Sequence, residues 1–166
     1  MLLIMVMGLP GSGKSYFASK LSERLKAVHL ENDVIRKELH KMGSYTREDK
    51  MEVYRELCRR TEKLIKEEKS VVVDATFQLK EYREFIYQLS SRFEVSLSTI
   101  LVEANESLVK KRLAKPRKRS EANYEVYLKM KGDFDPIRSP YIAITSGESN
   151  LESMLRQAMD YINPDQ

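Results

Sequence analysis

The stretch from Gly8 to Ser15 constrains the fold of this chain more than any other part of its sequence. It reads Gly-Leu-Pro-Gly-Ser-Gly-Lys-Ser, follows the apolar run 2–7 and precedes residues 16–26, which have helical spacing. A strand, a glycine-rich loop and a helix in this order form a phosphate-binding loop, or P-loop. The sequence therefore predicts a binding site for a nucleoside triphosphate.

The residue types in this loop suit the binding of phosphate groups. The glycines let the backbone curl so that successive N–H groups point at phosphate oxygens, and the positive end of the following helix adds to the attraction. We expect Lys14 to reach the β- and γ-phosphates and the Ser15 hydroxyl group to bind Mg²⁺. The other predicted ligands of ATP in the loop are Gly8, Gly11, Ser12 and Gly13.

Length and composition favour one ordinary globular domain that spans residues 1–166. No apolar run approaches the roughly 20 residues of a membrane span, so we expect no membrane partner. Residues 2–7 lack a basic leader and a cleavage site, and we interpret them as the first strand. The single cysteine and the two scattered histidines predict neither an internal disulfide nor a zinc site. A cytoplasmic location is the default expectation.

Apolar periodicity predicts strands that alternate with helices. The expected strands are 2–7, 27–30, 71–74, 95–102 and 141–145, and the expected helices are 16–26, 34–42, 46–69, 82–93, a helix that begins at Asn105, 121–131 and 151–162. Alternation of this kind is typical of a parallel sheet covered on both faces. The predicted fold is an α/β P-loop fold with five parallel strands and a lid rich in arginine.

Asp33 and Arg36 form the first candidate pair outside the P-loop. They lie three residues apart on a predicted helix directly after the second strand, so both side chains face the same way. A carboxylate beside the γ-phosphate can accept the proton of an attacking hydroxyl group, and a guanidinium group can bind an anionic acceptor. The alternative is an acid that stabilises a helix dipole and a surface arginine paired with it.

Asp74 and Thr76 follow the third strand, whose three valines indicate a central position in the sheet. P-loop proteins place at this point the carboxylate that holds Mg²⁺, so Asp74 is the second predicted metal ligand. Asp74 precedes Ala75 instead of a second acid, which argues against a mechanical ATPase. Thr76 is a candidate acceptor contact, although a turn hydroxyl group explains it equally well. We expect Arg83 to lie on an exposed helix face.

Seven basic residues between positions 110 and 119 carry the excess positive charge. Without them the acidic residues of the chain would outnumber the basic ones, although its net charge is +4. Pro116 interrupts the segment, which suggests a mobile lid that closes arginines over the γ-phosphate. We expect Arg112 and Arg117 to act in catalysis and Arg119 to contact the nucleotide.

With these residues in place, the sequence resembles the P-loop kinases that include polynucleotide 5′-kinases, zeta toxins and gluconate-kinase-like enzymes. The resemblance rests on GLPGSGKS at 8–15, NDVIRKEL at 32–39, VVVDATF at 71–77 and the basic segment that runs into Ser120-Glu121-Ala122, and it spans nearly the whole chain. It implies a five-stranded parallel sheet and transfer of the γ-phosphate of ATP, with Mg²⁺, to a hydroxyl group. It also implies Asp33 as the general base, Arg36 as the ligand of an acceptor phosphate and a lid arginine on the γ-phosphate.

The first expectation for function is a polynucleotide 5′-hydroxyl kinase that acts on a DNA or RNA end. Such a chain could be fused to, or act with, a phosphatase or phosphodiesterase module. The alternative is a kinase of a small molecule such as a sugar, a nucleoside or an antibiotic, which needs a closed pocket near helix 46–69. A nucleotide-switched or toxin-like binding protein is a third reading, which Asp33 and Arg36 make less favourable.

Overall fold

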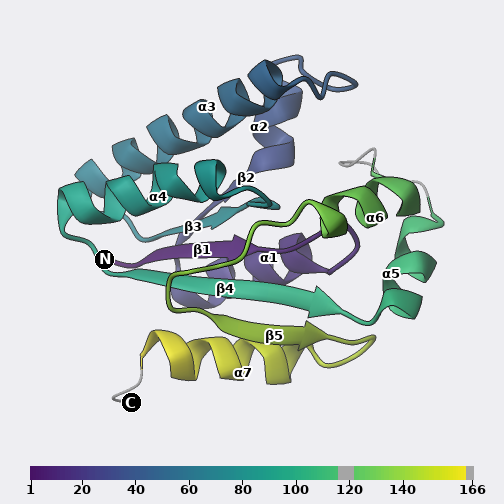
Figure 1. The fold of residues 1–166 in the computed structure, drawn as a ribbon. Coiled ribbons are helices and arrows are strands. Elements are labelled where there is room, and N and C mark those ends of the chain that lie inside the picture. Colours follow the sequence, from purple (N-terminus) through teal and green to yellow (C-terminus); the bar gives the residue numbers. More distant parts are fainter. Residues whose placement is uncertain (116–121, 164–166) are drawn as a thin grey trace.

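Five parallel strands form the central sheet of the protein (Figure 1). The computed structural model describes residues 1–115 and 122–163. The strands lie in the order β2-β3-β1-β4-β5, and every neighbouring pair is parallel. Their bounds are β1 Leu3–Met7, β2 Val28–Glu31, β3 Val71–Asp74, β4 Leu97–Ala104 and β5 Ile142–Ser146. The predicted five-stranded parallel α/β fold is therefore confirmed.

Seven helices connect and flank the strands in the described part of the chain. They are α1 Lys14–Leu25, α2 Asn32–Glu38, α3 Arg47–Lys66, α4 Lys80–Phe93, α5 Glu106–Leu113, α6 Tyr124–Gly132 and α7 Leu151–Ile162. Helix α2 begins directly at the end of β2 and ends four residues before the predicted limit, because His40 takes a left-handed backbone conformation (φ 57°). None of the helices in the described residues has the length and apolar character needed to cross a membrane.

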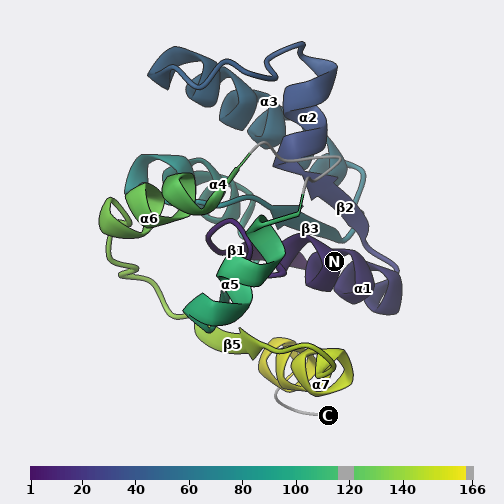
Figure 2. The same ribbon diagram turned by 90° about the vertical axis from the view of Figure 1, so that its right-hand side faces the viewer.

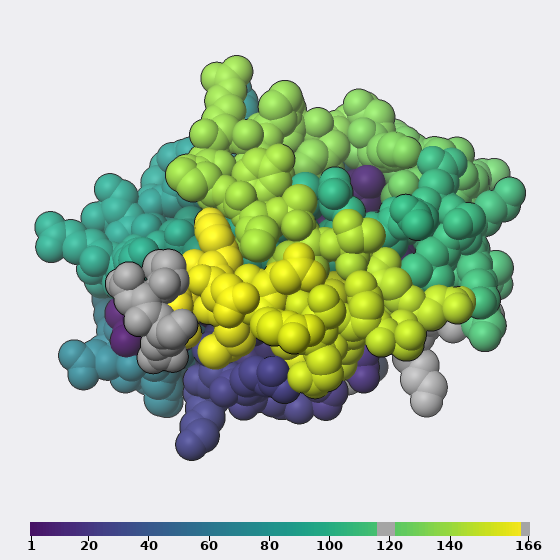
Figure 3. Space-filling model, turned by 90° about the horizontal axis from the view of Figure 1, so that it is seen from below, coloured from purple at the N-terminus to yellow at the C-terminus, as the bar shows by residue number. Residues whose placement is uncertain are grey.

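Apolar side chains cover both faces of the sheet, as predicted. Alternate residues of β1 point to opposite faces: Leu3 and Met5 pack with residues of α2, α3 and α4, whereas Ile4 and Val6 pack with residues of α1 and α7. Figure 2 shows these layers from the side, and Figure 3 shows the face covered by α7. The central strands β1 and β3 are buried along their whole length, which explains their nearly continuous apolar sequence.

The strand register brings the chemically active residues to one edge of the sheet. Asp74 at the end of β3 lies opposite Val6 of β1 and opposite Glu31 of β2. The P-loop follows β1 at the same edge, and α2 begins there directly after β2. Functional groups of parallel α/β proteins gather at the carboxyl ends of the strands. The sheet thus places the P-loop, the start of α2 and Asp74 side by side.

Candidate active site

The P-loop has the backbone conformation that binding of phosphate requires. Gly13 has a φ of 88° and stands directly before α1, whose first turn receives no hydrogen bond from a capping side chain. A Cβ atom at Gly13 would lie 2.9 Å from Ser146 Oγ and 3.0 Å from Arg112 Nη1. The torsion therefore favours glycine at this position, and a Cβ atom would in addition force the Ser146 or Arg112 side chain to shift. Within the described residues no capping side chain binds the N–H groups at the start of α1, where an anion can bind.

Arg112 lies against the P-loop from the side of α5. Its Nη1 donates to Gly11 O at 3.1 Å, and its Nη2 donates to Ser146 Oγ at 3.0 Å and to Gly147 O at 2.9 Å. The guanidinium group thus joins α5, the P-loop and the loop after β5. The sequence prediction placed Arg112 in a mobile lid, but the residue belongs to a regular helix and is held by these bonds. Arg117 and Arg119, like Ser120 and Glu121 of the motif, lie outside the described residues.

A cavity of about 330 Å³ opens beside the P-loop. Six of the residues selected from the sequence line it, namely Lys14, Ser15, Asp33, Arg36, Asp74 and Thr76. Its other walls come from Glu31 and Asn32 at the start of α2, from Tyr45, Lys50, Tyr54 and Tyr82 around α3 and α4, and from residues of α6 and its end, among them Val126, Lys129, Met130 and Asp133. The cavity therefore lies between the phosphate-binding loop and a wall built by α3 and α6.

Asp33 and Arg36 face this cavity from α2, which confirms their predicted placement on one side of a helix. Arg36 is buried, and its Nη1 donates to the backbone oxygen of Ser44 at 2.8 Å. Its guanidinium carbon lies 4.8 Å from the ring centroid of Tyr45, a distance that allows a cation–π interaction. Arg36 therefore also holds the loop between α2 and α3 in place, a role that the sequence did not indicate.

Asp74 is fully buried and lies beside two polar residues of β2. Its Oδ2 is 3.3 Å from His29 Nε2, and its Oδ1 has no hydrogen-bond partner within the described ranges. His29, Glu31 and Asp74 each offer one ligand atom, and these atoms lie within 4.8 Å of one another. A buried carboxylate oxygen without a partner and the nearby Ser15 hydroxyl group suit Mg²⁺, which prefers oxygen ligands.

The position of His29 revises the expectation that the histidines of this chain are scattered. His29 and Glu31 are two residues apart on one strand, so their side chains share a face. The parallel pairing of β2 with β3 then brings both next to Asp74. The signal in the sequence was the pattern His-x-Glu in a short strand, but it becomes informative only once the strand order is known.

Thr76 lines the cavity, and its hydroxyl group is positioned by Tyr54 of α3. The backbone N–H of Phe77 donates to Tyr54 Oη at 3.1 Å, so the phenol is free to donate to Thr76 Oγ1 at 3.3 Å. Burial raises the pKa of Tyr54, which keeps the phenol protonated. The ring of Tyr54 also stacks on Tyr82, with centroids 4.2 Å apart. The sequence analysis did not select Tyr54 as a site residue.

Arg83 is buried, so the prediction of an exposed position is wrong. Its Nε donates to Phe77 O at 2.7 Å and its Nη2 to Gln78 O at 2.9 Å. The same guanidinium group donates to Asp135 O at 2.6 Å and to Pro136 O at 2.9 Å. Backbone oxygens from two distant segments replace the water that a charged group needs. Arg83 thereby ties the turn after β3 to the segment that follows α6.

Comparison with known proteins agrees with this architecture. A family model described as "AAA domain" matches residues 3–137. No curated protein matches the chain. Among solved structures, a gluconokinase from Sinorhizobium meliloti is 19% identical with a TM-score of 0.76, and the alignment covers 98% of this chain and 92% of that one.

Two further structures show the same fold at low identity. A sugar kinase from Janibacter is 17% identical with a TM-score of 0.75, over 98% of this chain and 95% of that one. The APS kinase of Mycobacterium tuberculosis, solved in complex with AMPPNP and APS, is 18% identical with a TM-score of 0.73, over 98% and 97%. Together with the family match over residues 3–137, the P-loop and the sheet order, these findings place the chain in the AAA domain family, with the α/β fold of the P-loop kinases.

Proposed function

We propose that this protein is a kinase that transfers the γ-phosphate of ATP to a hydroxyl group of a small molecule. The observation that carries the proposal is the cavity of about 330 Å³ that joins Lys14 and Ser15 to Asp33 and is walled by α3 and α6. A cavity of this size is at the small end of the range for ligand sites. The sugar kinase, gluconokinase and APS kinase folds support this alternative over a polynucleotide acceptor.

In the proposed reaction the P-loop amides and Lys14 bind the phosphates of ATP. Ser15 and Asp74 would hold Mg²⁺, which would neutralise charge on the phosphates. The acceptor hydroxyl oxygen attacks the γ-phosphorus atom while its proton passes to the Asp33 carboxylate. The bond between the γ-phosphorus and the β–γ bridging oxygen breaks, and ADP leaves. Arg36 and Thr76 contact the acceptor, and Arg112 lies beside the nucleotide, with Arg117 and Arg119 as further candidates.

The test is transfer from γ-labelled ATP with Mg²⁺ to two sets of acceptors, small hydroxyl compounds and 5′-hydroxyl oligonucleotides. We expect labelled product only from the small compounds. Asp33→Asn should lower kcat by about 100-fold or more while ATP binding persists, because a general base contributes factors of that order. Asp160→Asn, on the exposed face of α7, is the matched control and should leave kcat unchanged. Product from oligonucleotides alone would overturn the small-molecule proposal.

A further inference from the structure

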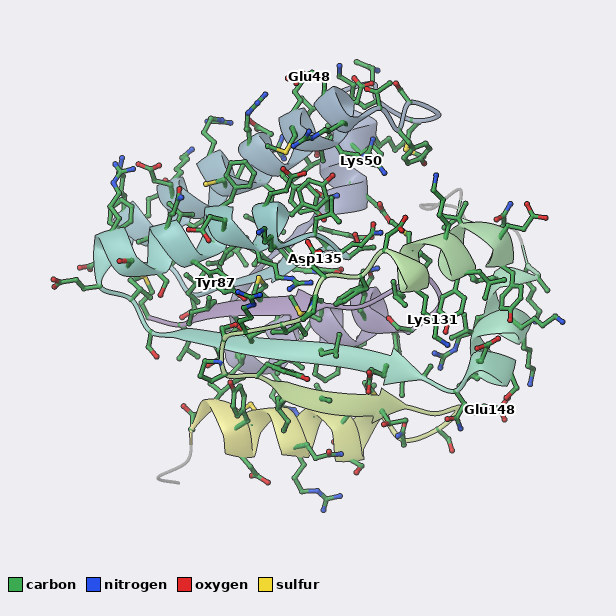
Figure 4. All side chains as sticks on the ribbon, viewed as in Figure 1. Glu48, Lys50, Tyr87, Lys131, Asp135 and Glu148 are labelled. Atoms are coloured by element: carbon green, nitrogen blue, oxygen red, sulfur yellow. The ribbon has the colours of Figure 1, made fainter. Side chains whose placement is uncertain are left out.

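Two lysines line the side of the cavity that lies away from the P-loop. Lys50 extends from the first turns of α3 and Lys129 from α6, and both line the cavity that contains Asp33 and Arg36. Figure 4 shows Lys50 between the α2–α3 pair and α6. Within the described residues, neither lysine forms an ion pair or a side-chain hydrogen bond, although many other lysines of the chain do.

The charges around Lys50 are mostly of the same sign. Burial and the nearby positive charges of Arg36 and Lys129 lower the pKa of Lys50, and only Asp133 acts in the opposite direction. Positive groups that converge without enough negative charge repel one another, and an anion between them removes that repulsion. The other acids of the cavity, Glu31, Asp33 and Asp74, stand at the ends of β2 and β3, on the side of the P-loop.

The cavity therefore has two chemically different sides. The sheet edge offers a proton acceptor and metal ligands, whereas α3 and α6 offer ammonium groups, and Tyr45, Tyr54 and Tyr82 line the same cavity. A ligand that reaches both sides needs a hydroxyl group at one end and a negative charge at the other. A neutral polyol would leave the partly buried ammonium group of Lys50 without a negative partner, which is unfavourable, and would make no use of the exposed Lys129 beside the same cavity.

Resting on the function proposed above, we propose that the acceptor carries an acidic group, a carboxylate or a phosphate, which Lys50 of α3 and Lys129 of α6 bind together. The acidic group fixes the orientation of the acceptor, so that its hydroxyl group lies between Asp33 and the γ-phosphate. Lys50 and Lys129 are binding and specificity residues in this arrangement and do not take part in the transfer of the proton.

The first test compares acceptors that differ only in the acidic group. The pairs are an aldonic acid with its alditol, and a sugar phosphate with its parent sugar, measured by acceptor-dependent release of ADP. We expect kcat/KM to be at least about 10-fold higher for the acidic member, and the two pairs distinguish carboxylate from phosphate. Equal use of acidic and neutral members would overturn the acidic-acceptor proposal and leave the kinase proposal standing.

The second test removes the lysines one at a time. Lys50→Ala and Lys129→Ala should each raise KM for the acidic acceptor by about 10- to 100-fold with little change in kcat, the range expected for hydrogen bonds to charged groups. The neutral acceptor should be unaffected. Lys63→Ala is the matched control, because Lys63 lies on the same helix with a side chain that is 70% exposed. Identical KM values for the three variants would contradict the proposal.

A binding measurement separates failure of this inference from failure of the kinase proposal. The P-loop is first filled with a non-hydrolysable ATP analogue, and the shift in unfolding temperature is then followed as millimolar sulfate is added. We expect a saturable shift in the wild type and in Lys63→Ala that is lost in Lys50→Ala and Lys129→Ala. If no small acceptor is phosphorylated, this loss still supports the anion site, whereas equal shifts in all variants overturn it.

Discussion

The Asp74 carboxyl group is held in an environment that favours function over stability. It is fully buried, one of its oxygens lacks a partner among the described residues, and the other is 3.3 Å from His29. A buried acceptor without a partner costs roughly 1–3 kcal/mol of folding free energy. Such a cost is expected where a bound ion or its water later supplies the missing interaction.

We therefore predict that Asp74→Asn separates metal dependence from stability. Mg²⁺ should increase nucleotide affinity clearly less in the variant than in the wild type, because a neutral amide is a weaker ligand of the ion or its water than a carboxylate. The free energy of unfolding without nucleotide should fall by less than about 1 kcal/mol, because the unfavourable burial of a charge is removed as well. Nucleotide titrations with and without Mg²⁺, and urea unfolding, measure the two effects. An unchanged Mg²⁺ effect would exclude Asp74 as a metal ligand.

At the scale of the elements, the connection between α6 and β5 is anchored along α4. Asp135 accepts a hydrogen bond from the Lys80 N–H at the start of α4 at 2.7 Å, and Tyr87 Oη lies 2.6 Å from Ser139 Oγ. Figure 4 shows Asp135 and Tyr87 along this connection. Arg83 completes the anchor through its bonds to the same segment. Because Gln78 and Asp133 line the cavity, this anchor positions two of its walls.

We predict that Arg83→Met destabilises the protein by about 3 kcal/mol, since it leaves buried backbone oxygens without donors. Urea unfolding measures the loss. Arg92→Met is the matched control on the same helix: Arg92 is 62% exposed, pairs with Glu62 and lies 5.0 Å from the ring centroid of Phe93, so its loss should cost less than about 1 kcal/mol. Where the Arg83 variant is still folded, the acceptor KM should also rise. Equal stability of the two variants would contradict the anchoring role.

The sequence predicted the strands well and the polar contacts between them poorly. Val71 to Asp74 was assigned correctly because a buried central strand is a continuous run of branched apolar residues. Arg83 was placed on the surface because a charge beside an apolar stripe normally faces water, and the carbonyl groups that bind it lie at positions 135 and 136. For the same reason, the sequence analysis did not predict that α6 forms a wall of the cavity. Where α6 lies relative to α3 depends on contacts between residues far apart in the sequence, and the apolar periodicity of one segment carries no information on them.

At the scale of the whole molecule, several side chains of the basic segment bind other parts of the same protein. Lys111 pairs with Glu148 of the loop after β5, Lys110 lies 5.4 Å from the ring centroid of Tyr124, and Arg112 is bonded to the P-loop. Figure 4 shows Glu148 at this edge of the molecule. Three of the four positive charges that the structure describes in this segment therefore have partners within the protein, which reduces what they can offer to a nucleic acid.

This arrangement predicts a shallow dependence of acceptor binding on salt. At saturating ATP, KM for the preferred acceptor should rise with salt at a logarithmic slope of about 2 or less, because few basic groups, chiefly Lys50 and Lys129, would bind its acidic group. An oligonucleotide releases counterions at each phosphate contact, with a slope of about 0.7 per contact on a single strand, so several contacts give a steeper line. Measurements of KM between about 50 and 200 mM KCl distinguish the two cases. A slope of about 4 would require many phosphate contacts and would favour a polynucleotide acceptor over a small molecule.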